Sequence, residues 1–245
     1  MPSWLRLSEG EGAGGEAPRQ NLMQFVRLLH LVDSALPTGS FAYSYGLESS
    51  FTFGLIKTPA DFRQHLYAYL QQAASLELPF MYSCFTLPAL GDELHQLAEE
   101  YDAQLLVPAL HRASVTQGKT WLKLLTTFYP AAGLTDLRAW FVARQLPLHF
   151  TLSFTLALKQ AGFPLPDLQA VYLHMALRDQ LSAAIRLGFL GPLEGHRLQH
   201  DFYAVFEHLL ACFAHLSYKE ASRSAFLLDA AQMLHEDVYS KLFQN

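Results

Sequence analysis

The sequence predicts an all-α fold, a single-domain helical bundle of roughly eight to ten helices. Apolar residues recur every three or four positions along most of the chain, as on the buried face of a helix. Capping residues and prolines stand where such stretches begin and end. No alternating run bounded by turn pairs suggests a strand. With 245 residues, 51% of them hydrophobic, the chain can bury one large core.

Residues 1–20 differ from the rest of the chain. They hold four of the fourteen glycines and show almost no periodicity, which predicts a disordered leader followed by an all-helical domain over 21–245. The leader lacks the apolar centre of a signal peptide, and the most apolar stretch, 146–158, is too short to span a membrane. Cys84 and Cys212 lie far apart, which suits a reducing compartment. We therefore expect a soluble, cytoplasmic protein.

The first helices are predicted from their boundaries. One helix ends near Ala35, because Pro37 follows. Another begins at Thr58-Pro59-Ala60-Asp61, where Thr58 can cap, Pro59 suits the first position and Asp61 favours the positive helix end. We expect that helix to break at Leu78-Pro79, with a further helix after it.

The middle of the chain predicts four helical segments. Asp92 opens one, and Pro108 marks the boundary to a helix with a mostly apolar stripe that includes Trp121. A loop over 130–133 precedes a short segment, 135–144. Residues 148–161 are apolar nearly all round, which predicts a central, fully buried helix.

Three helices are predicted for the last third. One starts at Pro166-Asp167 and ends near Gly188, and a turn over 191–195 leads to a helix over about 196–216. The last is expected from about 223 to 243. Its apolar face comprises Leu227, Ala231, Leu234, Val238 and Leu242.

Several kinds of chemistry are excluded or disfavoured. The net charge of −5 and the lack of a basic run argue against nucleic acid. No phosphate-binding loop or nucleophile elbow is present. Among eleven histidines, His196 and His200 form the best pair for a metal, but no third ligand is evident, and His235-Glu236 lacks the second histidine of a zinc motif. The remaining alternative is a helical-bundle enzyme with a metal or small-molecule pocket of histidines and carboxylates.

Charged residues in the long helix over 166–188 are interpreted mainly as solvent-facing. Arg178-Asp179-Gln180 interrupts an otherwise apolar pattern, and we favour a solvent face there over a buried polar node. Solvated charge is also the simplest interpretation of Arg178, Arg186 and Arg197 on residue type alone.

Three segments together resemble the UreF family of urease accessory proteins. Residues 28–48 contain Leu-Pro-Thr-Gly-Ser-Phe-Ala-Tyr-Ser-Tyr-Gly-Leu-Glu, similar to the family's opening turn. Residues 181–187, Leu-Ser-Ala-Ala-Ile-Arg-Leu, and the following turn to Leu198 are similar to its Ser-Ala helix. Residues 227–243 look like its ending, with His235-Glu236 and Tyr239-Ser240-Lys241-Leu242-Phe243. The resemblance covers about residues 22–245. The chain departs from the family pattern at 178–180, His196, Leu234 and Lys241.

The resemblance implies an all-α protein without catalytic chemistry or a cofactor of its own. Family members bind the accessory protein UreD, called UreH in some systems, and the GTPase UreG. The assembly delivers nickel to the urease apoprotein, and UreF bridges the two partners and modulates GTP use. Family members also tend to form homodimers. Neither nucleic acid nor a membrane is expected as a partner, because the net charge argues against the first and the short apolar stretch against the second.

The turn after Leu36 and the C-terminal tail are the expected contact elements. Pro37 is rigid and Gly39 is permissive, so the turn can present aromatic side chains at fixed angles. Aromatic side chains are favoured interface anchors, although packing in the core is a competing interpretation for each of them. The candidate partner-binding residues are Pro37, Gly39, Ser40, Phe41, Tyr43, Tyr45, Glu48, Arg186, Arg197, His235, Glu236, Tyr239, Lys241 and Phe243.

Overall fold

The computed structural model describes residues 16–88, 90–223 and 225–244, and these residues confirm the all-α prediction. They form ten α-helices joined by turns and short 3₁₀ segments, and they contain no β-strand. Within the same residues, no helix is long and apolar enough to cross a membrane. The chain divides into two compact units, Met1–Leu36 and Pro37–Asn245.

The first unit contains helix α1, Glu16–Leu31. It ends ahead of Pro37, as the restriction on residues before a proline predicts. The leader predicted over residues 1–20 lies outside the described residues as far as position 15, and Glu16 to Gln20 form the first turns of α1.

The second unit begins with a 3₁₀ turn, Ser40–Ala42, the short helix α2, Leu47–Thr52, and the long helix α3, Pro59–Thr86. The predicted start of α3 is confirmed, because the Thr58 hydroxyl accepts the Asp61 amide and the Asp61 carboxylate accepts the Thr58 amide. The predicted break at Leu78-Pro79 is wrong, since Pro79 lies inside α3.

A distant backbone segment allows Pro79 to remain in the helix. A proline donates no hydrogen bond, so the carbonyl four residues earlier, that of Ser75, has no partner within α3. The Ser222 amide donates to that carbonyl at 3.0 Å. The Ser75 hydroxyl in turn donates to the Ser222 carbonyl at 2.9 Å. The two serines thus satisfy the buried polar groups that the proline would otherwise leave unpaired.

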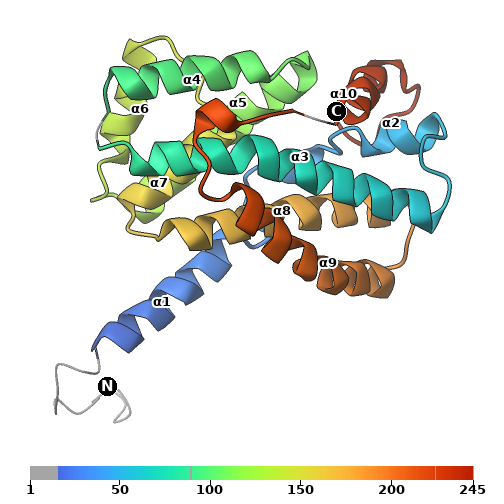
Figure 1. Ribbon diagram of the computed structural model, residues 1–245, viewed down its shortest axis with the longest axis horizontal. Helices are drawn as coiled ribbons and strands as arrows, with labels where there is room; N and C mark the ends of the chain where they lie inside the picture. The colour runs from blue at the N-terminus through green and yellow to red at the C-terminus, as the bar shows by residue number, and fades with distance from the viewer. Residues whose placement is uncertain (1–15, 89, 224, 245) are drawn as a thin grey trace. The chain divides into compact units, whose positions relative to one another are not determined.

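Seven further helices complete the second unit (Figure 1). The predicted central helix is α7, in which every residue from Thr151 to Leu158 is buried. Helices α3, α5, α6 and α8 all contact it, while α2 and α10 lie beside each other at one end of the unit. The seven helices are α4, Asp92–Gln104; α5, Pro108–Phe128; α6, Leu134–Ala143; α7, Phe150–Gln160; α8, Leu165–Arg186; α9, Pro192–Phe213; and α10, Phe226–Met233.

Gly118 brings α5 against the backbone that leads into α7. A Cβ atom at this position would lie 2.1 Å from the Leu148 carbonyl oxygen and 2.7 Å from the His149 carbonyl carbon. Both neighbours are backbone atoms and cannot rotate away. The two helices can therefore pack this closely only because residue 118 has no side chain.

Two predicted helix boundaries are wrong. Helix α9 begins at Pro192 rather than near His196, because proline suits the first helical position. The last helix, predicted over 223–243, covers only Phe226–Met233, followed by a 3₁₀ turn, Leu234–Asp237. Beyond the turn, the amides of Leu242 and Phe243 donate to the Glu48 carboxylate instead of to helical carbonyls.

The solvent-face interpretation of residues 178–180 is also wrong. Gln180 is completely buried; its amide group donates to the Ser44 carbonyl at 3.0 Å, and its oxygen lies 3.2 Å from Nε2 of His65. The Asp179 carboxylate is largely buried beside Arg178, and burial raises its pKa. This segment is the buried polar node, which joins α3, α8 and the turn that precedes α2.

We expect Gly118→Ala to destabilise the protein by at least about 2 kcal/mol, because the added methyl group overpacks the contact between α5 and the backbone entering α7. In an open helix the same change usually stabilises. Urea unfolding followed by circular dichroism measures the difference. Gly191→Ala is the control, since nothing lies within 4 Å of its Cβ position. Equal unfolding free energies for the wild type and Gly118→Ala would contradict the packing account.

We also expect the free energy of unfolding to fall as the pH decreases from about 6.5 to 4. Burial lowers the pKa of His65 from 6.5 to about 4. Within that interval the unfolded chain binds a proton that the native protein does not, so acidification favours unfolding. The contribution of this one group reaches about 3 kcal/mol at most.

The measurement is urea unfolding at several pH values, with His65→Gln expected to show a shallower decline than the wild type. His95→Gln is the matched control, because His95 is partly exposed and pairs with Glu99 on the surface of α4. If the wild type and His65→Gln lose stability in parallel, the assignment to His65 is wrong.

Candidate functional site

The turn before α2, residues 37–46, meets helix α10 at Gly46, and the tail that follows α10, residues 234–244, runs beside the same turn. Gly39 and Gly46 both adopt the left-handed conformation, with φ of 87° and 83°, which favours glycine. A Cβ atom at Gly46 would lie 2.8 Å from Cγ of Gln232 in α10. The Gln232 amide group donates to the Tyr45 carbonyl at 3.3 Å. Helix α10 therefore packs directly on the backbone of the turn.

The Glu48 carboxylate holds the end of the tail. It is buried in α2 and accepts hydrogen bonds from Nε2 of His235 at 2.9 Å, from the Leu242 amide at 2.6 Å and from the Phe243 amide at 3.2 Å. Hydrogen bonds to a charged acceptor are stronger than those between neutral groups. A single carboxylate thus fixes two separate parts of the tail.

Arg186, at the end of α8, joins the turn to the tail from another side. Its guanidinium carbon lies 3.5 Å from the centre of the Phe41 ring and 4.2 Å from that of Phe243. It also donates to the Phe41 carbonyl at 2.5 Å. Cations over aromatic faces are attracted by the ring quadrupole. The Gln244 amide donates to the Ala42 carbonyl at 2.7 Å, so the tail runs beside the turn.

The structure divides the predicted contact residues into a buried group and an exposed group. Packing inside the protein is the right interpretation for Tyr43, Glu48, His235 and Phe243, which are all buried. The exposed group includes the ring of Phe41 and the ring of Tyr239. The other exposed members are Pro37, Gly39, Arg197, Glu236 and Lys241, whereas Ser40, Tyr45 and Arg186 are partly buried.

Apolar side chains of α10 and the tail that were expected in the core point outward instead. Leu227 is 83% exposed, and Leu234 and Leu242 are exposed as well, whereas Ala231 and Val238 are buried as predicted. Phe226 and Met233 are further exposed residues that sequence reasoning missed. Their apolar character was the available signal, but it does not distinguish an internal partner from an external one. We define the turn–tail surface as Phe41, Phe226, Leu227, Met233, Tyr239 and Leu242.

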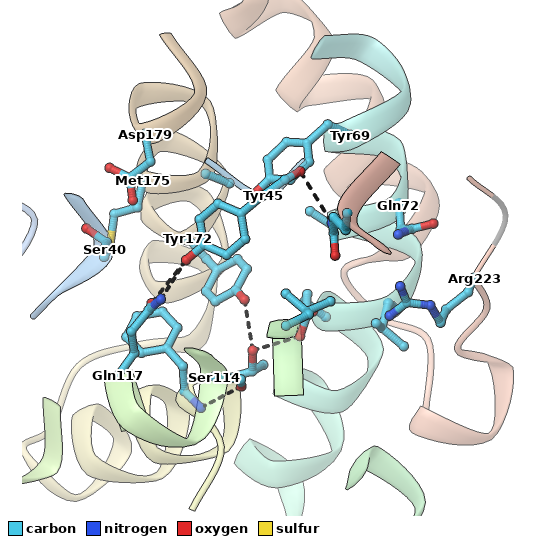
Figure 2. A pocket seen from close by; sticks show the side chains of 18 of the residues that line it. Ser40, Tyr45, Tyr69, Gln72, Ser114, Gln117, Tyr172, Met175, Asp179 and Arg223 are labelled. Carbon is cyan, nitrogen blue, oxygen red and sulfur yellow. Dashed lines mark hydrogen bonds between the residues drawn. The ribbon is translucent and has the colours of Figure 1, made fainter. Parts of the chain in front are cut away.

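The inner side of the turn lines a cavity of about 110 Å³ (Figure 2). Figure 2 shows Tyr45, Tyr69 and Tyr172 around it, with Gln117 on one side and Arg223 on the other. The Tyr45 hydroxyl and the Gln117 side chain are hydrogen-bonded at 2.8 Å. Pockets for drug-sized ligands usually measure about 300 Å³ or more, so this cavity is too small for a ligand of that size.

The Glu77 carboxylate lies at the wall of this cavity. Glu77 accepts hydrogen bonds from the hydroxyls of Tyr101 and Thr151, each at 2.7 Å. Burial raises its pKa, and both hydrogen bonds oppose that rise. Together with Ser40 and Asp179, these residues supply polar groups to a cavity whose lining is otherwise mostly apolar.

Arg197 and the predicted histidine pair lie elsewhere. Arg197, His196 and His200 line an open groove of about 710 Å³ between the starts of α3 and α9. In the described part of the chain, neither histidine belongs to a group of three possible metal ligands. The three residues that are grouped in this way are Asp102, His111 and His149, none of which the sequence pattern had selected.

Comparison with known proteins decides the family. Residues 56–203, more than half of the chain, match the family model described as UreF. The chain belongs to the UreF family. It is 34% identical over 215 residues to urease accessory protein F of Arabidopsis thaliana, covering 87% of this chain and 89% of the relative.

Relatives from other organisms agree with this assignment. Urease accessory protein F of Oryza sativa subsp. japonica is 34% identical over 217 residues, 87% of this chain and 82% of the relative. Urease accessory protein UreF of Azoarcus sp. is 31% identical over 231 residues, 93% of this chain and 98% of the relative. The resemblance seen in the sequence is thus confirmed, and membership of the UreF family supports a role in urease maturation.

We expect Glu48→Gln to loosen the tail of this UreF-family protein. Glutamine offers one acceptor oxygen and places an NH₂ group against the amides of Leu242 and Phe243. Hydrogen bonds to charged groups contribute about 1.5–3 kcal/mol each, so exchange of these two amides should accelerate about tenfold or more. Hydrogen exchange measured by mass spectrometry or NMR tests this.

Glu236→Gln is the matched control for Glu48→Gln. Glu236 is a glutamate of the same tail, but its side chain is 76% exposed and lies 4.0 Å from Arg112. Its replacement should leave the exchange of Leu242 and Phe243 unchanged. Equal exchange in the wild type and Glu48→Gln would show that the carboxylate does not hold the tail.

Proposed function

We propose that this UreF-family protein is a cytoplasmic scaffold for urease maturation that has no catalytic chemistry of its own. In this proposal it binds a UreD/UreH-like accessory protein and a UreG-like GTPase. The assembly then delivers nickel to the urease apoprotein in a GTP-dependent manner. The family assignment supports the maturation role. The sequence contains no phosphate-binding loop, which fits a division in which the partner performs the nucleotide chemistry.

The turn–tail surface is the observation that carries the proposal. Its six side chains are large and apolar, and their exposure opposes the usual preference of such groups for burial. The backbone beneath them is held by buried hydrogen bonds to Glu48 and by Arg186 between two aromatic rings. Exposed apolar anchors on a fixed support are typical of protein interfaces, because little conformational entropy is lost on binding.

We assign this surface to the UreD/UreH-like partner. Interfaces of permanent complexes are more hydrophobic than those of transient ones. The turn–tail surface is apolar, whereas the groove that contains Arg197 is bordered by charged residues such as Glu194 and Asp201. A partner that remains bound suits the first surface better than a GTPase that binds and dissociates during a cycle.

We further propose that the protein forms a homodimer. Only 16% of its residues are charged, and apolar side chains outside the turn–tail surface are also exposed, among them Val142 and Leu193. A second apolar contact, with another copy of the chain, would cover part of this area. Light scattering coupled to size exclusion of the purified chain distinguishes a dimer from a monomer.

We expect Leu227→Asp to abolish stable binding of the UreD/UreH-like protein. The charge would have to be buried without a partner in an apolar interface. Because Leu227 is exposed in the free protein, its replacement should change the stability of the free chain by less than about 0.5 kcal/mol. The measurement is co-purification with a tagged partner from cells that express all three accessory proteins.

The matched control is Leu106→Asp, an exposed leucine between α4 and α5 that lies outside the turn–tail surface. It should retain the complex. If Leu227→Asp binds as well as the wild type, the assignment of the surface is wrong. If the wild-type chain never co-elutes with either partner, the proposed function itself fails.

A further inference from the structure

Three helix ends bring one carboxylate and two imidazoles together. Asp102 lies near the end of α4, His111 lies in the first turn of α5, and His149 caps α7. Oδ1 of Asp102 is 2.6 Å from Nε2 of His111 and 2.8 Å from Nε2 of His149. One ligand atom from each residue lies within 4.8 Å of the other two.

We propose that Asp102, His111 and His149 bind one divalent first-row transition metal ion of the Zn²⁺ or Ni²⁺ type. Imidazole nitrogen with a carboxylate oxygen suits these ions, whereas Mg²⁺ and Ca²⁺ prefer oxygen ligands alone. This site is independent of the proposed partner contacts, so either inference can fail without the other.

The geometry requires only small adjustments to accept an ion. With metal–ligand bonds of about 2.0–2.2 Å, neighbouring ligand atoms lie roughly 3.0 Å apart around an octahedral ion and roughly 3.4 Å apart around a tetrahedral one. The two Nε2–Oδ1 distances of 2.6 and 2.8 Å therefore need to lengthen by roughly 0.2–0.8 Å. The ion would take the place of the two hydrogens that now lie between these atoms, and each hydrogen would move to Nδ1 of its own imidazole.

The site is open on one side. His149 is completely buried, but the side chains of Asp102 and His111 are 37% and 35% exposed. An ion could therefore enter from solvent past these two residues and keep water or another ligand on its outer side. Three protein ligands with open positions differ from the closed, four-ligand arrangement of structural zinc sites.

Ser114 provides the support that metal-binding histidines usually have. Its hydroxyl oxygen lies 3.2 Å from Nδ1 of His149 and also accepts the Phe150 amide at 3.2 Å. Without a metal, Nε2 of His149 donates to Asp102 and the Ser114 hydroxyl donates to Nδ1. When Nε2 binds the ion, its proton moves to Nδ1 and is donated to the Ser114 oxygen, whose hydroxyl hydrogen turns away. The proton count of the imidazole is unchanged.

The local environment favours the binding forms of His149 and Asp102. Burial lowers the pKa of His149 to about 4, so its imidazole is neutral near pH 7. Desolvation raises the pKa of Asp102, but hydrogen bonds from His149 and His111 outweigh it, and the net pKa is lowered. The Tyr101 ring packs edge-on against His149 at 5.2 Å, and the close approach of Gly118 fixes the same backbone.

The competing account is that these residues form only a hydrogen-bond network between three helix ends. Titration of the full chain with Zn²⁺ or Ni²⁺, followed by calorimetry, separates the two. We expect one ion per chain in the wild type and at least a tenfold loss of affinity in His111→Ala. Co²⁺ should give a visible d–d absorption that the variant lacks, and Mg²⁺ should not compete.

Two further variants and one control complete the test. Ser114→Ala should lose affinity about 10- to 100-fold, as is usual for partners of metal-binding histidines. Asp102→Asn should lose affinity while retaining side-chain shape. His200→Ala removes an exposed histidine of α9 and should bind as the wild type does. Circular dichroism confirms that each variant is folded; His111 is the primary position because it is partly exposed.

The proposal is overturned if the wild-type chain binds neither Zn²⁺ nor Ni²⁺ at one ion per chain. It is equally overturned if His111→Ala and Asp102→Asn, both folded, bind as tightly as the wild type. Loss of binding in His200→Ala alone would assign the metal to surface histidines instead. In a supporting result, the ion also raises the melting temperature of the wild type but not that of His111→Ala.

Discussion

Between Thr151 and Leu158, helix α7 has no face that contacts water, and this constraint organises the second unit. Its residues from Thr151 to Leu158 are buried, so helices must cover it on every side. The polar side chains inside α7 are compatible with burial because hydroxyls such as that of Thr155 donate to carbonyls one turn earlier. Gly118 permits the closest of these contacts, with α5. Contacts with α7 also position α3 and α8, and these two helices support the turn and the tail.

Polar contacts hold the tail on the helical bundle more than the burial of its own apolar residues does. Glu48 and Arg186 act from α2 and α8, and both reach backbone groups as well as side chains. Because hydrogen bonds and a cation between rings secure the backbone, Leu227 and Tyr239 are left free to face outward.

The sequence predicted most of the helices, since each has a start that local chemistry defines, such as Thr58 with Asp61. The prediction failed where the groups that satisfy or complete a site lie far apart along the chain. Pro79 reads as a helix break because nothing nearby shows that Ser222 will satisfy the freed carbonyl. The group of Asp102, His111 and His149 was missed for the same reason, because its three members come from separate helix ends. The apolar periodicity of α10 was visible, but periodicity does not show which side of a helix a second protein covers.

The pairing of Ser75 with Ser222 couples α3 to a segment 147 residues further along the chain. Ser75 is buried, and its carbonyl obtains its partner only when residue 222 is in place. A chain that stops before this point leaves that carbonyl unpaired in the interior, at a cost of about 1–3 kcal/mol. Prematurely terminated copies therefore keep a defect in the middle of α3. Because of Pro79, the pairing of buried polar groups in α3 depends on the segment around residue 222.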